Sequence, residues 1–176
     1  MLSEASTYSD CMRAIRSTQE LYAHAIAIER EAAERYGELA GRMADEGRDE
    51  LATVFDMLAR MEAEHLEALE RRTDDTALPA IAPAQYQWLD AGAPETAARE
   101  LIFRLMTPRQ ALAIALEAER RAQAFFERVF STADDPALRA LAREMAAEEQ
   151  EHVALIERLL ERTPENSLTS TLIFSR

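Results

Sequence analysis

The sequence predicts an all-α fold, a bundle of four helices arranged as two antiparallel hairpins. Composition supports this, because the 176 residues are 48% hydrophobic and 30% charged and include only four glycines and six prolines. Apolar residues also recur at helical spacing through four long segments, and the second half of the chain repeats the pattern of the first. The expected helices span residues 18–45, 48–72, 108–132 and 136–162, within a single domain covering residues 1–176.

The first helix is expected to start after Ser17, which forms a capping-box pattern with Glu20. Its apolar stripe consists mostly of alanine, isoleucine and tyrosine, and Glu29 falls in the middle of that stripe. Tyr36 lies on the same stripe, seven residues after Glu29. Four polar residues of this helix are expected to lie away from the stripe: His24, Glu31, Glu34 and Glu38.

The second helix is expected to run antiparallel to the first, because only a short turn around Gly47 separates them. Its apolar stripe includes Glu62 and His65. Residues 73–107 then form a connection longer than an ordinary loop, with one short helix expected at 95–105. A link of this length suits the crossover of a bundle in which one hairpin is joined to the other along the length of the molecule.

The third helix has a well-defined start, with Thr107 as N-cap and Pro108 at the first helical position. Glu119 interrupts its apolar stripe, as Glu29 interrupts that of the first helix. An aspartate–proline pair opens the fourth helix, whose stripe includes Glu149 and His152. Four glutamates near these stripes are expected to be solvated: Glu64, Glu67, Glu148 and Glu151.

Charge and cysteine content exclude several classes of protein. The formal charge of −13 argues against binding to nucleic acid or to an anionic membrane. Cys11 is the single cysteine, so neither an internal disulfide nor a four-cysteine metal site is available. No apolar run approaches a membrane span or a signal peptide, so a cytoplasmic protein is expected. Residues 1–16 could be helical or extended, and the apolar end of the tail 163–176 is expected to pack on the bundle or on another subunit.

The internal repeat brings metal-ligating residue types into register. Glu62 and His65 form a Glu-x-x-His step, and the same step recurs 87 residues later. Residues three apart share one face of a helix, so each step aims a carboxylate and an imidazole in the same direction. Single glutamates 90 residues apart occupy matching positions on the first and third helices. The expected ligands of a dinuclear metal site are therefore Glu29, Glu62, His65, Glu119, Glu149 and His152.

Charge balance gives a physical reason for buried glutamates. An unpaired carboxylate in an apolar interior costs several kcal/mol or becomes protonated, whereas four carboxylates balance two divalent cations. In this interpretation Glu62 and Glu149 bridge the ions, Glu29 and Glu119 are terminal ligands, and each histidine binds one ion. Oxygen and imidazole ligands suit two iron ions, or manganese or a mixed pair, and the lack of thiolate argues against copper(I) or structural zinc.

These motifs resemble those of the ferritin-like superfamily, and within it the rubrerythrin group. The resemblance covers about residues 18–162 and rests on Glu29 with Tyr36, the two Glu-x-x-His steps, and Glu119. It implies a ferritin-like fold and gives Tyr36 a role in hydrogen bonding to a ligand carboxylate. Rubrerythrins usually add a rubredoxin domain with a four-cysteine iron site, which this sequence does not contain. They also carry an extra glutamate where this chain has Ala122, a departure that argues against their ligand-switching peroxidase mechanism.

Three functions are compatible with this pattern. The first is a non-haem diiron oxidoreductase that oxidises ferrous iron with oxygen or peroxide, or reduces peroxide with electrons from a separate rubredoxin-type protein. The second is an iron-binding module without turnover of its own, and the third is a structural bundle with a vestigial site. The resemblance further implies a homodimer.

Overall fold

The computed structural model describes residues 15–82 and 107–163. Four long helices are present, and these described residues contain no strand: α1 (Thr18–Asp45), α2 (Asp49–Arg72), α4 (Pro108–Thr132) and α5 (Pro136–Arg162). Each helix begins and ends within one residue of its expected bounds. The all-α four-helix bundle is therefore confirmed. The expectations for residues 1–14, for a short helix at 95–105 and for the C-terminal tail lie outside the described residues.

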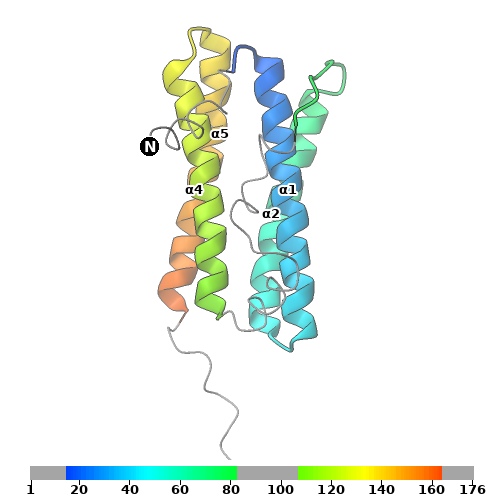
Figure 1. The fold of residues 1–176 in the computed structure, drawn as a ribbon, viewed down its shortest axis with the longest axis vertical. Helices are drawn as coiled ribbons and strands as arrows, with labels where there is room; N and C mark the ends of the chain where they lie inside the picture. The colour runs from blue at the N-terminus through cyan, green and yellow to red at the C-terminus, as the bar shows by residue number, and fades with distance from the viewer. Residues whose placement is uncertain (1–14, 83–106, 164–176) are drawn as a thin grey trace, which may run out of the picture.

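The four helices pair as two antiparallel hairpins that lie side by side (Figure 1). α1 and α2 are joined by a tight turn in which Gly47 has φ of +69°, a left-handed conformation that suits glycine. α4 and α5 form the second hairpin. In Figure 1, α2 ends at the opposite end of the bundle from the start of α4. The connection between them therefore joins opposite ends, as expected of a ferritin-like crossover.

Side-chain caps define where α1 and α4 begin. The Thr107 hydroxyl accepts a hydrogen bond from the Gln110 backbone N–H at 3.2 Å, and the Gln110 side chain accepts one from the Thr107 N–H at 2.8 Å. At the matching position of α1, the Ser17 hydroxyl accepts from the Glu20 N–H at 3.1 Å. The Glu20 carboxylate, however, accepts from the N–H of Arg16 at 2.9 Å, one residue before the expected donor. Both helices thus start at their predicted N-caps.

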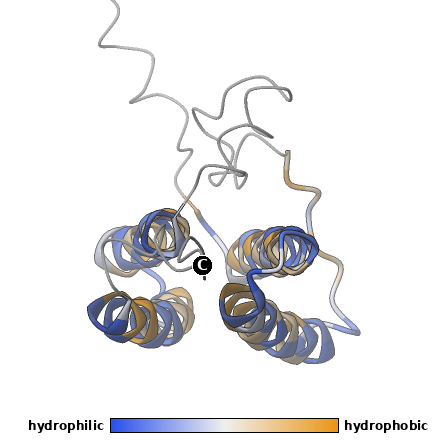
Figure 2. Cartoon of the chain, turned by 90° about the horizontal axis from the view of Figure 1, so that it is seen from below, coloured by the Kyte–Doolittle hydropathy of each residue, from blue (hydrophilic) through white to orange (hydrophobic). Residues whose placement is uncertain are grey.

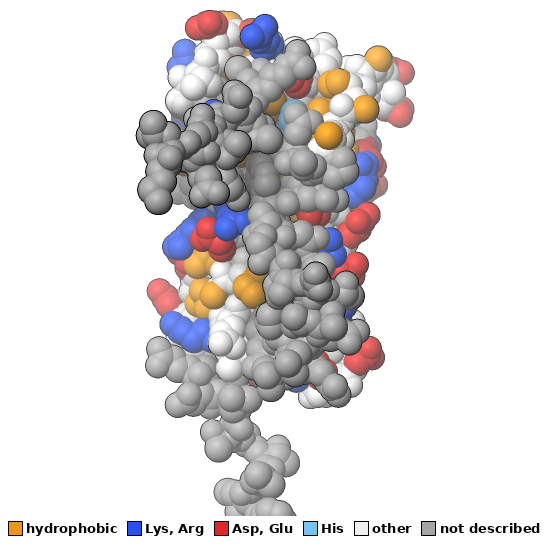
Figure 3. All heavy atoms as spheres, in the orientation of Figure 1, with side chains coloured by type: hydrophobic (Ala, Val, Ile, Leu, Met, Phe, Trp, Pro, Cys, Tyr) orange, Lys and Arg blue, Asp and Glu red, His pale blue; other side chains and the backbone are white. Residues whose placement is uncertain are grey.

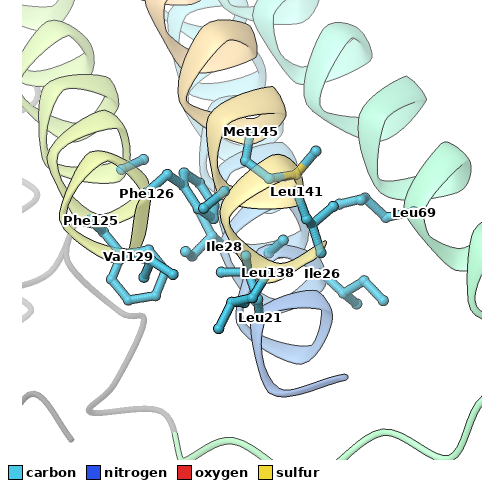
Figure 4. Close-up of a cluster of buried hydrophobic side chains, with 13 residues drawn as sticks. Leu21, Ile26, Ile28, Leu69, Phe125, Phe126, Val129, Leu138, Leu141 and Met145 are labelled. Atoms are coloured by element: carbon cyan, nitrogen blue, oxygen red, sulfur yellow. The ribbon is translucent and has the colours of Figure 1, made fainter. Parts of the chain in front are cut away.

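Two apolar clusters fill the bundle, one toward each end, and all four helices contribute residues to both. Figure 2 shows hydrophobic and hydrophilic residues alternating around each of the four helices. The first cluster is shown in Figure 4 and contains Leu21, Ala25, Ile26, Ile28, Leu69, Ala122, Phe125, Phe126, Val129, Leu138, Leu141, Ala142 and Met145. The second contains Tyr36, Met43, Leu51, Phe55, Leu58, Ala111, Leu112, Ala115, Leu116 and Ile156. On every helix, the glutamates and histidines of the expected metal site fall between the residues of these two clusters.

The described surface is covered by acidic and arginine side chains that lie close to one another, as the face in Figure 3 shows. Several form ion pairs, including Arg72 of α2 with Glu144 of α5 at 2.6 Å, which ties the two hairpins together. Among the helices that the structure describes, none has a stretch long and apolar enough to cross a membrane.

Candidate metal centre

The structure brings all six expected ligands to the layer between the two apolar clusters. The four carboxylates are buried, each no more than 3% exposed: Glu29, Glu62, Glu119 and Glu149. His152 is 1% exposed, whereas His65 is half-buried. One glutamate comes from each of the four helices, and the histidines come from α2 and α5. Four acids in a dry interior require either compensating positive charge or protonation.

His152 lies at the point where three of these carboxylates meet. Its Nδ1 atom is 3.1 Å from Glu62 Oε1, 3.4 Å from Glu119 Oε2 and 3.8 Å from Glu149 Oε2. One ligand atom from each of Glu62, Glu119 and His152 lies within 4.8 Å of the others, a separation that a single cation could bridge. The Glu-x-x-His step of α5 therefore faces the glutamates of α2 and α4.

The two imidazoles meet at the centre of the bundle. The rings of His65 and His152 stack with centroids 4.9 Å apart and an angle of 30° between their planes. Several buried side-chain atoms around them lack a hydrogen bond of good geometry: Glu29 Oε2, Glu62 Oε1, His65 Nδ1 and both ring nitrogens of His152. Buried polar atoms are normally satisfied, so a concentration of unsatisfied ones indicates that another group belongs there.

The electrostatics of the cluster reflect crowding of like charges. Burial raises the pKa of Glu29 well above its ordinary value, and hydrogen bonding to Glu62 and the negative charges of Glu62 and Glu119 add to the shift. Burial likewise raises the pKa of Glu149, together with the charges of Glu29 and Glu119. Without metal, these two carboxyls therefore retain protons that ordinary glutamates would lose.

Two other members of the cluster form a charged pair. Burial opposes ionisation of Glu62, but hydrogen bonds from His152 and Glu29 outweigh it and lower the pKa of Glu62. Burial also disfavours the charged imidazole, yet hydrogen bonding to Glu119 and Glu62 raises the pKa of His152 to about 10. In the metal-free protein, a protonated His152 thus supplies part of the positive charge that bound cations would provide.

Tyr36 forms the hydrogen bond across the bundle that was predicted for it. Its hydroxyl, on α1, donates to Glu119 Oε1 on α4, and the side chain is fully buried. Burial and the neighbouring Glu119 charge raise the pKa of Tyr36 well above its ordinary value, so the hydroxyl remains a donor. The matching position in the other half is Phe126, which is also fully buried and has no hydroxyl.

Three polar side chains lie elsewhere than predicted. His24 is buried rather than on the surface: its Nδ1 is 2.8 Å from the Glu20 carbonyl oxygen, and its ring stacks on Phe125 at 5.5 Å. Glu31 is also buried. Glu148 is half-buried rather than solvated, and burial raises its pKa, although the nearby charge of His65 opposes the shift. The exposed positions predicted for Glu64, Glu67 and Glu151 are confirmed.

The burial of His24 has a physical cause in the packing of α1. From Leu21 to Ile26 five of the six residues are buried, so the buried face of this helix is wider than a single stripe. α1 packs on α2 within its hairpin and also contacts α4 through the His24–Phe125 stack. The alanines on either side of His24 were the signal in the sequence that could have revealed its burial.

The residues present fit metal ions. Carboxylate oxygens and imidazole nitrogens are the ligands that iron and manganese favour, and the buried atoms without partners supply free coordinating positions. Four carboxylates of charge −1 with two neutral imidazoles would balance two divalent cations. The buried cluster of glutamates and histidines is thus a site that could bind metal.

Comparisons with known proteins agree with this arrangement. The family model described as Rubrerythrin matches residues 20–98, which include all but the first two residues of α1, the whole of α2 and the first Glu-x-x-His step. A solved structure, an uncharacterized conserved protein from Magnetospirillum magnetotacticum MS-1, is 35% identical with a TM-score of 0.75. The alignment covers 87% of this chain and 99% of that one. No curated protein matches the sequence. With its ferritin-like bundle and its Glu and His residues in register, the chain belongs to the rubrerythrin family.

Proposed function

We propose that this protein is a non-haem diiron oxidoreductase. The observation that carries the proposal is the convergence of four buried glutamates and two stacked histidines in one layer of the bundle. In the proposed centre, Glu62 and Glu149 would be shared by two iron ions, and Glu29 and Glu119 would each bind one ion. The remaining ligands, His65 and His152, would also bind one ion each. Manganese or a mixed pair would suit the same ligands.

The proposed reaction is oxidation of ferrous iron by oxygen or peroxide, or reduction of peroxide with electrons from an external donor. An iron pair supplies redox chemistry, since it cycles between ferrous and ferric states. A separate rubredoxin-type protein would be a suitable donor, because single-electron carriers of that kind match the redox steps of an iron centre. The family relationship supports the proposal.

The chain itself would position the ions and control access to them. The two apolar clusters lie on either side of the glutamates and histidines along the bundle, and they exclude water from that direction. Exclusion of water strengthens the electrostatic interactions among these residues. Tyr36 holds the Glu119 carboxylate in one orientation. Half-buried His65 and Glu148 lie beside one another, so this side of the layer is where a small oxidant could approach.

Ala122 excludes exchange of a histidine ligand with an additional carboxylate at this position. This residue lies on α4, three residues after Glu119, and is 4% exposed within the first apolar cluster. Its methyl group cannot coordinate a cation, so no additional carboxylate stands at this position to exchange with a histidine. We therefore propose a reaction in which the ligands keep their places.

Metal loading tests the proposal directly. Protein purified without chelator is analysed for metal, then reduced and loaded with ferrous iron under anaerobic conditions. Exposure to oxygen or to peroxide should consume the oxidant and produce the near-ultraviolet absorption of a ferric pair. Stable binding of ferrous iron without oxidation would instead support a metal-binding module, and failure to bind stoichiometric metal would support a vestigial site in a structural bundle.

A further inference from the structure

The two halves of the metal centre differ in how firmly their ligands are held. We call the group formed by Glu62, Glu119 and His152 the His152 site, because these three donors converge within 4.8 Å. The His65 site consists of Glu29 and His65 together with the bridging carboxylates. His152 is 1% exposed, whereas His65 is half-buried, so only the His65 site borders the solvent.

A hydrogen bond separates the two sites further. The Tyr36 hydroxyl donates to Glu119 and fixes the terminal carboxylate of the His152 site. The internal repeat places Phe126 at the equivalent position for Glu29, and a phenyl ring cannot donate. In agreement with that difference, Glu29 Oε2 is buried without a hydrogen-bond partner. The Glu119 carboxylate therefore accepts a hydrogen bond from a tyrosine hydroxyl, whereas Glu29 has no such donor and hydrogen-bonds only to Glu62, another carboxyl of the centre.

We propose that the two sites bind metal unequally, with the His152 site binding the first and tighter ion and the His65 site the second. This inference rests on the proposed dinuclear centre and adds an order of loading to it. Hydrogen-bonding partners of metal ligands typically change metal affinity by about 10- to 100-fold. We expect the dissociation constants of the two sites to differ by about that factor.

Exposure favours the same order. The His65 side chain is partly exposed although its Nδ1 is buried, whereas both ring nitrogens of His152 are buried. Water should therefore compete for the ion more readily at the His65 site. The ion at the His65 site should therefore also be the first to leave when a chelator is added. An exchangeable outer ion beside a retained inner one would let the protein take up and release iron at one position.

The test must identify the sites as well as count the binding steps, because a first cation weakens the binding of a second even at identical sites. Metal-free full-length protein is titrated anaerobically with cobalt(II), followed by visible absorption and calorimetry. His65→Ala and His152→Ala form the matched pair. His65→Ala should keep the tight step and lose the weak one, and His152→Ala should lose the tight step.

Two further variants address the hydrogen bond without deleting a ligand. Tyr36→Phe should weaken the first step by about 10- to 100-fold and leave the second nearly unchanged. Phe126→Tyr should move the two steps closer together. Both substitutions change a single hydroxyl, so circular dichroism and thermal melting should show an intact fold.

Results that differ from these expectations would contradict specific parts of the proposal. If His65→Ala removes the tight step, or Tyr36→Phe leaves the first step unchanged, the assigned order is wrong. Two equal steps in the unaltered protein would also reject unequal sites while preserving the dinuclear centre. If the unaltered protein binds no cobalt at all, the proposed function fails together with the inference.

Discussion

The two hairpins of the bundle repeat each other in more than their metal-binding motifs. Arg30 of α1 pairs with Glu70 of α2 at 2.7 Å, and Arg120 of α4 pairs with Glu157 of α5 at the same distance. These residues keep the spacing of the repeat, 90 residues between the arginines and 87 between the glutamates. The N-caps of α1 and α4 are repeated in the same way. The same ion pair thus joins the two helices at equivalent positions in both hairpins.

The hairpins differ in the side chains packed around that shared frame. Tyr36 corresponds to Phe126, and Phe55 corresponds to Ala142, although all four are fully buried. Tyr36 and Phe55 lie together in the second apolar cluster, with ring centroids 6.1 Å apart. The two hairpins thus place the expected metal ligands at equivalent positions, but the side chains that pack around those ligands differ. A bundle built from two similar hairpins can therefore hold a metal site whose two halves are unlike.

The largest expected effect comes from removing a proposed bridging carboxylate. Glu62→Ala in the first hairpin and Glu149→Ala in the second should each abolish binding of at least one ion, because a bridging ligand serves both ions. Metal per chain after dialysis, measured by elemental analysis, is the readout. Glu64→Ala is the matched control, since Glu64 is exposed on the same helix. Retention of two metals by either variant at Glu62 or Glu149 would show that the bridging assignment is wrong.

A second expected effect is that the metal-free protein loses stability as pH rises. Glu29 and Glu149 have raised pKa values, so their contributions are complete below their unfolded value of about 4.5 and are lost as pH rises through the folded values. The pKa of His152 is raised to about 10, so its contribution is complete below about 6.5 and is lost as pH rises through about 10. Glu62 has the opposite sign, because its pKa is lowered.

Urea unfolding of the metal-free protein between about pH 6 and pH 9 checks this expectation. Glu62 is ionised in both the folded and the unfolded state across this range, because its pKa is lowered from 4.5. The raised pKa values of Glu29, Glu149 and His152 should therefore make the free energy of unfolding decline from about pH 6 to about pH 9. Bound cations replace the protons of the cluster, so metal-loaded protein should show a weaker or reversed dependence. If the free energy of unfolding of the metal-free protein instead rises toward about pH 9, the raised pKa values assigned to Glu29, Glu149 and His152 are wrong.

The fold was predictable because its signals are local. Helical periodicity gave the four helices, and Thr107 and Ser17 mark the starts of α4 and α1 through caps that the structure contains. Burial of Glu29 and Glu119 was predictable as well, since each interrupts an otherwise apolar stripe. The roles of these residues as metal ligands stay predictions.

Other features depended on tertiary packing and could not be derived from periodicity. His24 is buried and stacks on Phe125 of α4. The flanking alanines hint at burial, but no pattern within one helix identifies α4 as the second neighbour of α1. The sequence placed Glu62, Glu119 and His152 in one site, but the distances among them depend on side-chain conformations from three helices. The half-burial of Glu148 on α5 likewise depends on packing between helices.

A smaller effect is expected at the repeated N-caps. Ser17→Ala and Thr107→Ala should each lower the free energy of unfolding by about 1 kcal/mol, because each removes an acceptor for a backbone N–H in the first turn. Thr107→Ala should cost at least as much, since Thr107 belongs to a complete reciprocal capping box. Urea unfolding of both variants measures the difference. A cost at Ser17 well above that at Thr107 would reverse the ranking of the two caps.

The smallest expected effect concerns the repeated ion pairs. Glu70→Gln and Glu157→Gln should each change the free energy of unfolding by less than about 1 kcal/mol, because all four side chains of these pairs are roughly half exposed. The two changes should also agree closely, since the pairs have the same distance and similar exposure. Unfolding curves at low and high salt compare them, and salt should reduce both effects alike. A large effect in one hairpin alone would show that the frame itself, and not only its packing, differs between the two halves.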